Sequence, residues 1–175
     1  MAGRIAAAEM VEGAGVDVSM LLTLLVDSAA GELSTCKQLD LLRQAPSRPD
    51  GERARQRVDA AAADDRRHFD ALVVRIHELG GTLPDDMKEP HTRPSCPSAA
   101  SCDTADRRES LLRAKQFAVR SYTRICDMTF GRDPRTYRLV LTILDEEIGH
   151  EAWLSELVGH NPGDRQVIGS TMTTA

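Results

Sequence analysis

The sequence predicts an all-α protein, a bundle of four long helices with one long crossover in the middle. Aromatic residues are only 3% of the chain, so the core must rest on Leu, Val, Ile and Ala, which suits packed helices. Apolar residues recur at helical spacing in four stretches, and the connections between them are short, long and short. That order is a standard four-helix-bundle topology. At 175 residues we expect one domain with a full core.

The first half of the chain predicts two helices. We expect the first over residues 18–43, capped by Asp17 or Ser19, and the second over residues 51–79. Gly80-Gly81 would end the second helix. Residues 1–16 are Ala- and Gly-rich and are predicted to form a flexible N-terminal tail. The predicted inward faces are Leu22, Leu25, Ala29, Glu32, Cys36 and Leu39, then Val58, Ala61, Asp65, His68, Leu72 and Ile76.

The second half predicts two more helices after an irregular segment. Residues 82–106 hold four of the eight prolines, as expected of a crossover that runs the length of a bundle. The third helix is expected over residues 107–130 and the fourth over 134–158, with Asp133 as its cap and Pro134 at its first position. The bundle would span 17–160, followed by a C-terminal tail over 161–175. The predicted inward faces are Leu112, Lys115, Val119, Tyr122 and Cys126, then Val140, Leu144, Glu147, His150 and Leu154.

Charge and composition narrow the class of partner. The formal net charge is −5, and nonspecific nucleic-acid binding depends on Lys and Arg, so no nucleic acid is expected. No apolar run approaches the roughly 20 residues that a membrane span needs, so no membrane is expected either. The chain has no C-x-x-C pair, which leaves a zinc knuckle unsupported. A cytoplasmic protein with mostly reduced thiols is predicted. The cysteines are Cys36, Cys96, Cys102 and Cys126.

One motif occurs twice and carries the candidate chemistry. Asp65-x-x-His68 and Glu147-x-x-His150 each place a carboxylate and an imidazole on one helix face. Glu32 lies 33 residues before Asp65. Carboxylates in a bundle core are costly unless they are paired or bind a cation. Three of them near two imidazoles therefore indicate a metal centre, and oxygen-rich sites with one imidazole per metal suit iron or manganese.

Two stretches resemble a known family. Residues 65–87, with His-Phe-Asp-Ala-Leu and Glu-Leu-Gly-Gly-Thr-Leu-Pro-Asp-Asp-Met, are similar to the ferritin-like superfamily, as are residues 131–157, with Asp-Glu-Glu-Ile-Gly-His-Glu-Ala-Trp. The Dps-like group, also called thioferritins, is the closest match over residues 20–159. The resemblance implies a ferritin-like four-helix subunit of a hollow homo-oligomer, typically of twelve copies, with twenty-four as the alternative. It also implies oxidation and storage of iron with protection against oxidative stress. Bacterioferritins match less well, and Arg66 replaces their haem-ligating Met, so no haem is expected.

The family pattern is incomplete in this chain. The resemblance implies the metal ligands Glu32, Asp65, His68, Glu147 and His150, but the sixth position, normally a Glu, falls on Lys115. Asp65 is also one methylene shorter than the usual Glu. Three carboxylates and one ammonium leave a charge of −2, which matches one divalent ion rather than two. Lys115 either lies across the second metal position and pairs with Glu147 or Glu32, or snorkels to solvent and leaves the centre intact.

The thiols of the family are altered as well. The thioferritin group places two cysteines beside the metal site; Cys96 matches the first, and Phe117 stands at the second. Two alternatives remain for Cys96 and Cys102: a disulfide between them, or two free thiols. Tyr122 is predicted to face inward, and its role is either packing or redox chemistry.

Three functions fit these residues. The first is an iron-binding, Dps-like ferritin with an altered ferroxidase centre. The second is a metal-deficient cage or shell protein with a structural or partner-binding role. The third is a bundle enzyme that uses one metal and Lys115 for different oxygen chemistry. The iron-binding ferritin would bind one or two metal ions per subunit, the enzyme one, and the shell protein none.

Overall fold

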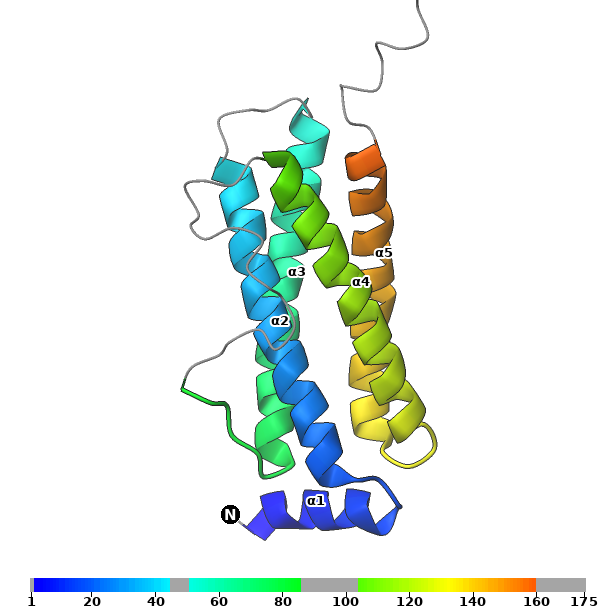
Figure 1. The fold of residues 1–175 in the computed structure, drawn as a ribbon. Coiled ribbons are helices and arrows are strands. Elements are labelled where there is room, and N and C mark those ends of the chain that lie inside the picture. The colour runs from blue at the N-terminus through cyan, green and yellow to red at the C-terminus, as the bar shows by residue number, and fades with distance from the viewer. Residues whose placement is uncertain (1, 45–50, 86–103, 160–175) are drawn as a thin grey trace, which may run out of the picture.

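The fold of the described residues is entirely helical. The computed structural model describes residues 2–44, 51–85 and 104–159, and within them the chain forms α1 (Ala2–Gly13), α2 (Val18–Gln44), α3 (Gly51–Glu78), α4 (Thr104–Thr129) and α5 (Pro134–Gly159). Helices α2 to α5 lie side by side as a four-helix bundle (Figure 1). The predicted fold class is confirmed, and the four predicted helices begin and end within one turn of the observed ones.

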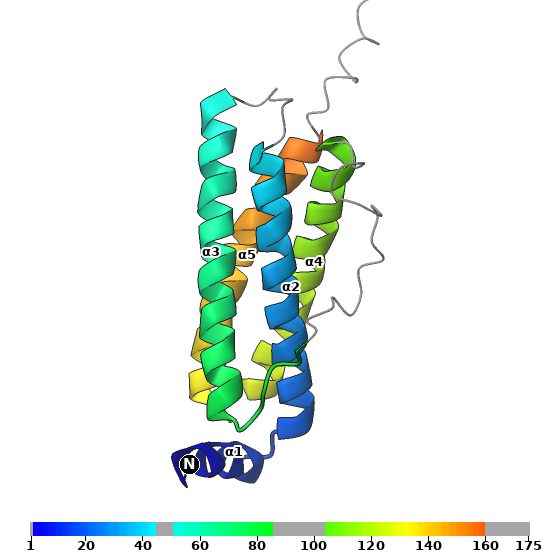
Figure 2. The ribbon, with the colours of Figure 1, turned by 90° about the vertical axis from the view of Figure 1, so that its left-hand side faces the viewer.

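The helices pack as two hairpins. Helix α2 packs along α3, α4 packs along α5, and α2 also contacts α4 (Figures 1 and 2). Helices α3 and α4 run in the same direction along the bundle, which is the topology that a long crossover requires. Each hairpin thus contributes one acid-x-x-His helix, α3 in the first and α5 in the second.

The predicted helix ends are confirmed by their hydrogen bonds. Asp17 Oδ1 accepts from the Met20 amide at 2.9 Å, and Asp133 Oδ1 accepts from the Thr136 amide at 3.1 Å, so both acids cap a helix. Gly80 adopts φ 82° after α3, and the Gly81 amide donates to the Ile76 carbonyl at 2.9 Å. Such a turn favours glycine, because a Cβ strains a left-handed backbone.

The N-terminal prediction was wrong. Residues 2–13 form helix α1 instead of a flexible tail, and α1 lies across one end of the bundle (Figures 1 and 2). Val11 and Val16 are buried in the same apolar cluster as Leu21 and Leu25. Two valines on an Ala-rich segment give almost no periodic signal, and the contacts with the bundle stabilise the short helix. The predicted C-terminal tail, Cys96 and Cys102 lie outside the described residues.

A polar layer divides the apolar core in two. One apolar cluster, on the side of α1, includes Leu25, Leu72 and Ile143, and the other includes Leu39 and Leu154. Between these clusters the buried residues are charged or polar. This layer contains the six predicted site positions, all buried: Glu32, Asp65, His68, Lys115, Glu147 and His150.

Among the described residues, α2 has the length and apolar composition to cross a membrane, with a mean hydropathy of 1.2 over its most apolar window. In this structure α2 packs against α3 and α4 and carries the buried Glu32, as a core helix of a bundle does.

Candidate metal centre

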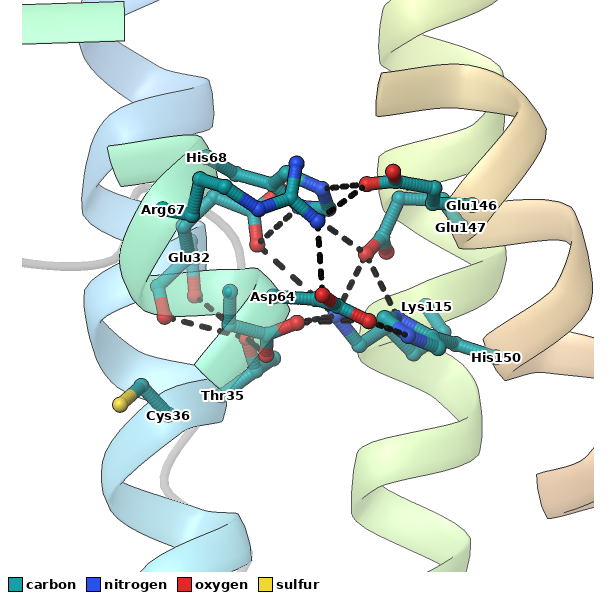
Figure 3. Close-up of polar contacts among 12 residues, drawn as sticks. Glu32, Thr35, Cys36, Asp64, Arg67, His68, Lys115, Glu146, Glu147 and His150 are labelled. Atoms are coloured by element: carbon teal, nitrogen blue, oxygen red, sulfur yellow. Dashed lines mark hydrogen bonds and ion pairs between the residues drawn. The ribbon is translucent and has the colours of Figure 1, made fainter. Parts of the chain in front are cut away.

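The side chain of Lys115 lies at the middle of the polar layer. It is 1% exposed, so it does not reach solvent along its helix. Its Nζ atom donates to Asp65 Oδ1 at 2.7 Å and to Glu147 Oε1 at 2.8 Å, and lies 3.8 Å from Glu32 Oε2 (Figure 3). Of the two predicted alternatives, the structure shows the lysine turned inward and paired with the carboxylates.

The charges of the layer depend on one another. Burial alone would lower the pKa of Lys115, but the charges of Glu32, Asp65 and Glu147 outweigh burial and hold that pKa above its usual range. Burial raises the pKa of Glu147, but Lys115 and His150 outweigh it and lower that pKa to about 2. Asp65 has its pKa raised to about 6, because burial and the neighbouring carboxylates outweigh Lys115. Lys115 is therefore a cation at neutral pH, surrounded by three carboxylates and bonded directly to Asp65 and Glu147.

The imidazole of His68 connects the layer to the surface. Its Nε2 lies 2.5 Å from Glu146 Oε2, while Nδ1 points inward, 3.6 Å from both Glu32 Oε2 and Glu147 Oε1. Burial disfavours the charged ring, but the three carboxylates outweigh it and raise the pKa of His68 to about 9. At neutral pH the metal-free centre therefore holds a protonated His68, whose proton a metal ion would displace.

Three buried atoms of the layer have no hydrogen-bond partner in the protein. They are Glu32 Oε2, His68 Nδ1 and Glu147 Oε2. An unpaired buried polar atom costs about 1–3 kcal/mol, so three in one place need an explanation. One ligand atom each from Glu32, Asp65, His68 and Glu147 lies within 4.8 Å of the others. A cation bound among these side chains would supply the partner that the protein does not, so these side chains fit a metal ion.

The remaining carboxylate oxygens are held by the protein. Asp65 Oδ2 accepts from Thr35 Oγ1 at 2.6 Å, so both oxygens of Asp65 already accept hydrogen bonds. Glu32 Oε1 accepts from the Tyr122 hydroxyl at 2.5 Å. Burial, with the charge of Glu32, raises the pKa of Tyr122 well above its usual value, so the phenol stays a donor. Glu32 and Glu147 are thus left with one free oxygen each, and Asp65 with none.

His150 lies on the Lys115 side of these contacts. Its Nδ1 is 3.0 Å from Glu147 Oε1 and 3.7 Å from Asp65 Oδ1, and its Nε2 is 3.4 Å from Asp64 Oδ2. The rings of His150 and His68 are 6.4 Å apart. The structure therefore brings all six predicted residues together, but His150 is not among the four whose ligand atoms converge.

The residues that hold these groups were not predicted from the sequence. Asp64 and Glu146 each contact the outer nitrogen of the histidine on the opposite helix, and Arg67 bridges them, with Nη2 at 2.7 Å from Asp64 and 3.1 Å from Glu146 (Figure 3). A signal was present, because both motifs read acid-acid-x-x-His. Such carboxylates orient a histidine whose inner nitrogen faces a metal. Thr35 has no comparable sequence signal.

The fold and the layer together define a class. Four long helices that bury carboxylates and two acid-x-x-His motifs at mid-length are the architecture of the ferritin-like metal-carboxylate proteins. A family model described as the ferritin-like domain matches residues 45–162. The DNA protection during starvation protein of Pyrococcus furiosus is 44% identical over 156 residues, covering 87% of this chain and 84% of that protein. The chain therefore belongs to the ferritin-like family, among its Dps-like members.

Solved structures show the same fold at lower identity. A dodecameric thioferritin from Bacteroides fragilis superposes with a TM-score of 0.79 at 19% identity, over 94% of this chain and 99% of that one. A bacterioferritin from Desulfovibrio desulfuricans gives 0.65 at 20% identity, over 90% and 94% of the two chains. A ferritin-like diiron-carboxylate protein from Bacillus anthracis gives 0.65 at 19% identity, over 81% and 97%.

Proposed function

We propose that this chain is a Dps-like ferritin subunit that takes up ferrous iron for oxidation and storage and protects the cytoplasm against oxidative stress. The name of the Pyrococcus furiosus relative supports the protective role, and its identity of 44% supports a shared activity. The dodecameric state of the Bacteroides fragilis thioferritin favours a hollow cage of twelve copies. Haem is not part of this proposal. A stable monomer of 19.2 kDa in light scattering at micromolar concentration would contradict the cage.

The proposed centre takes one metal ion per subunit. The observation that carries this is the set of unpartnered buried atoms, Glu32 Oε2, His68 Nδ1 and Glu147 Oε2. Lys115 already supplies a positive charge between Asp65 and Glu147, where a second ion would be needed. Three carboxylates and one ammonium leave −2, the charge that one divalent ion balances. One imidazole and two carboxylates suit iron, with manganese as a second candidate.

Each side chain has a distinct part in this proposal. Glu32, His68 and Glu147 bind the ion, which as ferrous iron is the species to be oxidised. Lys115 holds Glu147 Oε1, so that Oε2 is the oxygen left for the ion. Glu146 bonds His68 Nε2 and so directs the lone pair of Nδ1 inward once the ring is neutral. We place Asp65 and His150 with Lys115, as its counter-ion and neighbour, although the resemblance counts both among the ligands.

One observation favours the metal-deficient shell as a second candidate. With a pKa of about 9, His68 joins Lys115 as a second cation among the carboxylates when no metal is bound. The charge of these side chains is then −1 rather than −2, closer to the neutrality that a purely structural bundle would require. A shell protein of this kind would keep its stability and assembly without any bound ion.

Metal analysis separates the two candidates. The native protein, purified without chelator and loaded with ferrous iron under anaerobic conditions, is expected to hold one ion per subunit. His68→Ala is expected to hold almost none, because it removes an unpartnered nitrogen from the centre. His77→Ala is the matched control, because His77 lies on the same helix beyond the polar layer, and it should keep one ion. An iron content near zero in the native protein would favour the shell, and two ions would refute the one-ion centre.

A further inference from the structure

The hydroxyl of Tyr122 contacts a candidate ligand from outside the ligand set. Tyr122 lies seven residues after Lys115 on α4, so both side chains share one helix face. Its ring is fully buried within the apolar cluster that contains Leu25, and its hydroxyl reaches the polar layer and donates to Glu32 Oε1 at 2.5 Å. A bond of that length is typical of a hydroxyl that donates to an ionised carboxylate.

We infer that Tyr122 is a positioning residue, which fixes Glu32 so that a single oxygen faces the metal ion. This inference rests on the proposed one-ion centre. With Oε1 held by Tyr122, Oε2 is the oxygen left unpaired, 3.6 Å from His68 Nδ1 and 3.8 Å from Lys115 Nζ. Without the hydroxyl, the carboxylate is free to rotate toward the ammonium or to present both oxygens to the ion.

Helix α2 has no tyrosine at the position that matches Tyr122. Tyr122 follows Lys115 by seven residues on α4, and the residue that follows Glu32 by seven on α2 is Leu39, which is fully buried and apolar. Of the two helices, only α4 therefore carries a tyrosine at this position, and its hydroxyl donates to Glu32. Lys115 needs no matching donor from α2, because Asp65 and Glu147 already accept hydrogen bonds from its ammonium.

A double-mutant cycle on metal affinity tests the inference. Co²⁺ is the probe, because its visible absorption reports both binding and the geometry of the ligands. Removing an outer partner of a metal ligand typically weakens binding about 10-fold to 100-fold, so Tyr122→Phe should raise the Kd for Co²⁺ at least about 10-fold and alter the visible spectrum. In a Glu32→Gln background the same change should cost less than about 2-fold, because the tyrosine acts through Glu32.

Tyr137→Phe is the matched control. Tyr137, the second of the two tyrosines in the chain, stacks edge-on against Phe130 with 5.3 Å between ring centroids and packs against the apolar cluster on the side of α1. The Tyr137→Phe substitution should leave the Kd for Co²⁺ and the visible spectrum unchanged. An unchanged Kd in Tyr122→Phe, or an equal loss with and without Glu32, overturns the inference. A native protein that binds neither Co²⁺ nor Fe²⁺ overturns the proposed centre itself.

A second measurement needs no change at Tyr122. In Tyr137→Phe protein, Tyr122 is the sole remaining tyrosine, so ultraviolet resonance Raman bands of tyrosine report its hydroxyl alone. Binding of Co²⁺ withdraws charge from Glu32 and should shift those bands with the same midpoint as the visible titration. Bands that do not move while Co²⁺ binds would overturn the inference even where Tyr122→Phe fails to fold.

Discussion

Two buried cations in this bundle have opposite surroundings. At the end of the bundle near α1, Arg75 donates to Asp133 Oδ2 at 2.7 Å, to Thr136 Oγ1 at 2.7 Å and to Glu78 Oε2 at 3.1 Å. Asp133 in turn caps α5, and no buried side-chain atom of this Arg75–Asp133 cluster is left without a hydrogen-bond partner. At mid-bundle, Lys115 is equally buried, yet three polar atoms around it lack partners.

This difference indicates that the Arg75–Asp133 cluster is structural and that the Lys115 layer is a binding site. The Arg75–Asp133 cluster joins α3 to the start of α5, and its hydrogen bonds are complete, so it needs nothing from outside the chain. The Lys115 layer carries more carboxylates than cations, and the three side chains with unpaired atoms are among the four whose ligand atoms converge. Unpaired buried atoms weaken a fold unless a ligand satisfies them, so the mid-bundle layer is where binding is expected.

The largest effect is expected from Lys115→Glu, which reverses a charge inside the layer. Without metal, the variant should lose about 5 kcal/mol of stability, because four carboxylates would then face one another without a buried ammonium. Divalent iron should restore the stability, and two ions per subunit should bind. Adding Asp65→Glu should increase the affinity for the second ion non-additively. Urea unfolding with and without iron measures both effects, and an unchanged metal-free stability would contradict them.

A smaller effect is expected from breaking the end cluster. Asp133→Ala leaves Arg75 buried without its main partner and removes the cap of α5, which should destabilise the protein by about 3 to 4 kcal/mol. The metal content should stay at the native value, because the cluster shares no residue with the layer. A loss of bound iron at full occupancy of the folded state would show that the two regions are coupled.

The end cluster also predicts a pH dependence. Burial raises the pKa of Asp133, but hydrogen bonds from Thr136 and Arg75 outweigh it and lower that pKa below its usual value. The stabilisation from Asp133 is therefore complete above the unfolded-state pKa, about 3.9, and is lost as the pH falls through the lower folded-state value. Between about pH 5 and pH 3, the free energy of unfolding of the native protein should fall more steeply than that of Asp133→Asn. Parallel curves would contradict this.

The smallest effect is expected from Thr35→Val. It removes the hydrogen bond to Asp65 Oδ2 and should destabilise the protein by about 1.5 kcal/mol, since bonds to charged groups are worth about 1.5–3 kcal/mol. Thr142→Val is the control, because Thr142 donates to the Arg138 carbonyl on an exposed helix face, and it should change stability by less than about 0.5 kcal/mol. Equal changes in the two variants would show that Thr35 does not hold Asp65.

The sequence predicted the bundle and the polar layer, because both depend on helical spacing. All six predicted inward residues of α3 are buried, from Val58 to Ile76. On α2 four of the six predicted inward residues are buried: Leu25, Ala29, Glu32 and Leu39. The other two, Leu22 and Cys36, are half-buried, and their neighbours Leu21 and Thr35 are buried as well. The apolar run of α2 gives no contrast that would separate a buried position from the one beside it.

The contacts across the bundle were not predictable from spacing. The bond from Tyr122 to Glu32 and the bond from Thr35 to Asp65 join different helices, and both depend on how the helices are rotated against one another. The inward placement of Lys115 was predicted as one of two alternatives, and the carboxylates around it decide between them. Helix α1 was missed, because its burial depends on the bundle end and not on its own pattern.

In the proposed centre Lys115 stands in for one of two metal ions. Anomalous diffraction from crystals of the native protein, grown anaerobically with ferrous iron, locates the bound iron. We expect one iron peak per subunit in the polar layer, bounded by Glu32, His68 and Glu147, with the Lys115 ammonium still between Asp65 and Glu147. Two peaks in the layer, with Lys115 displaced, would contradict the claim, as would a layer without any iron peak.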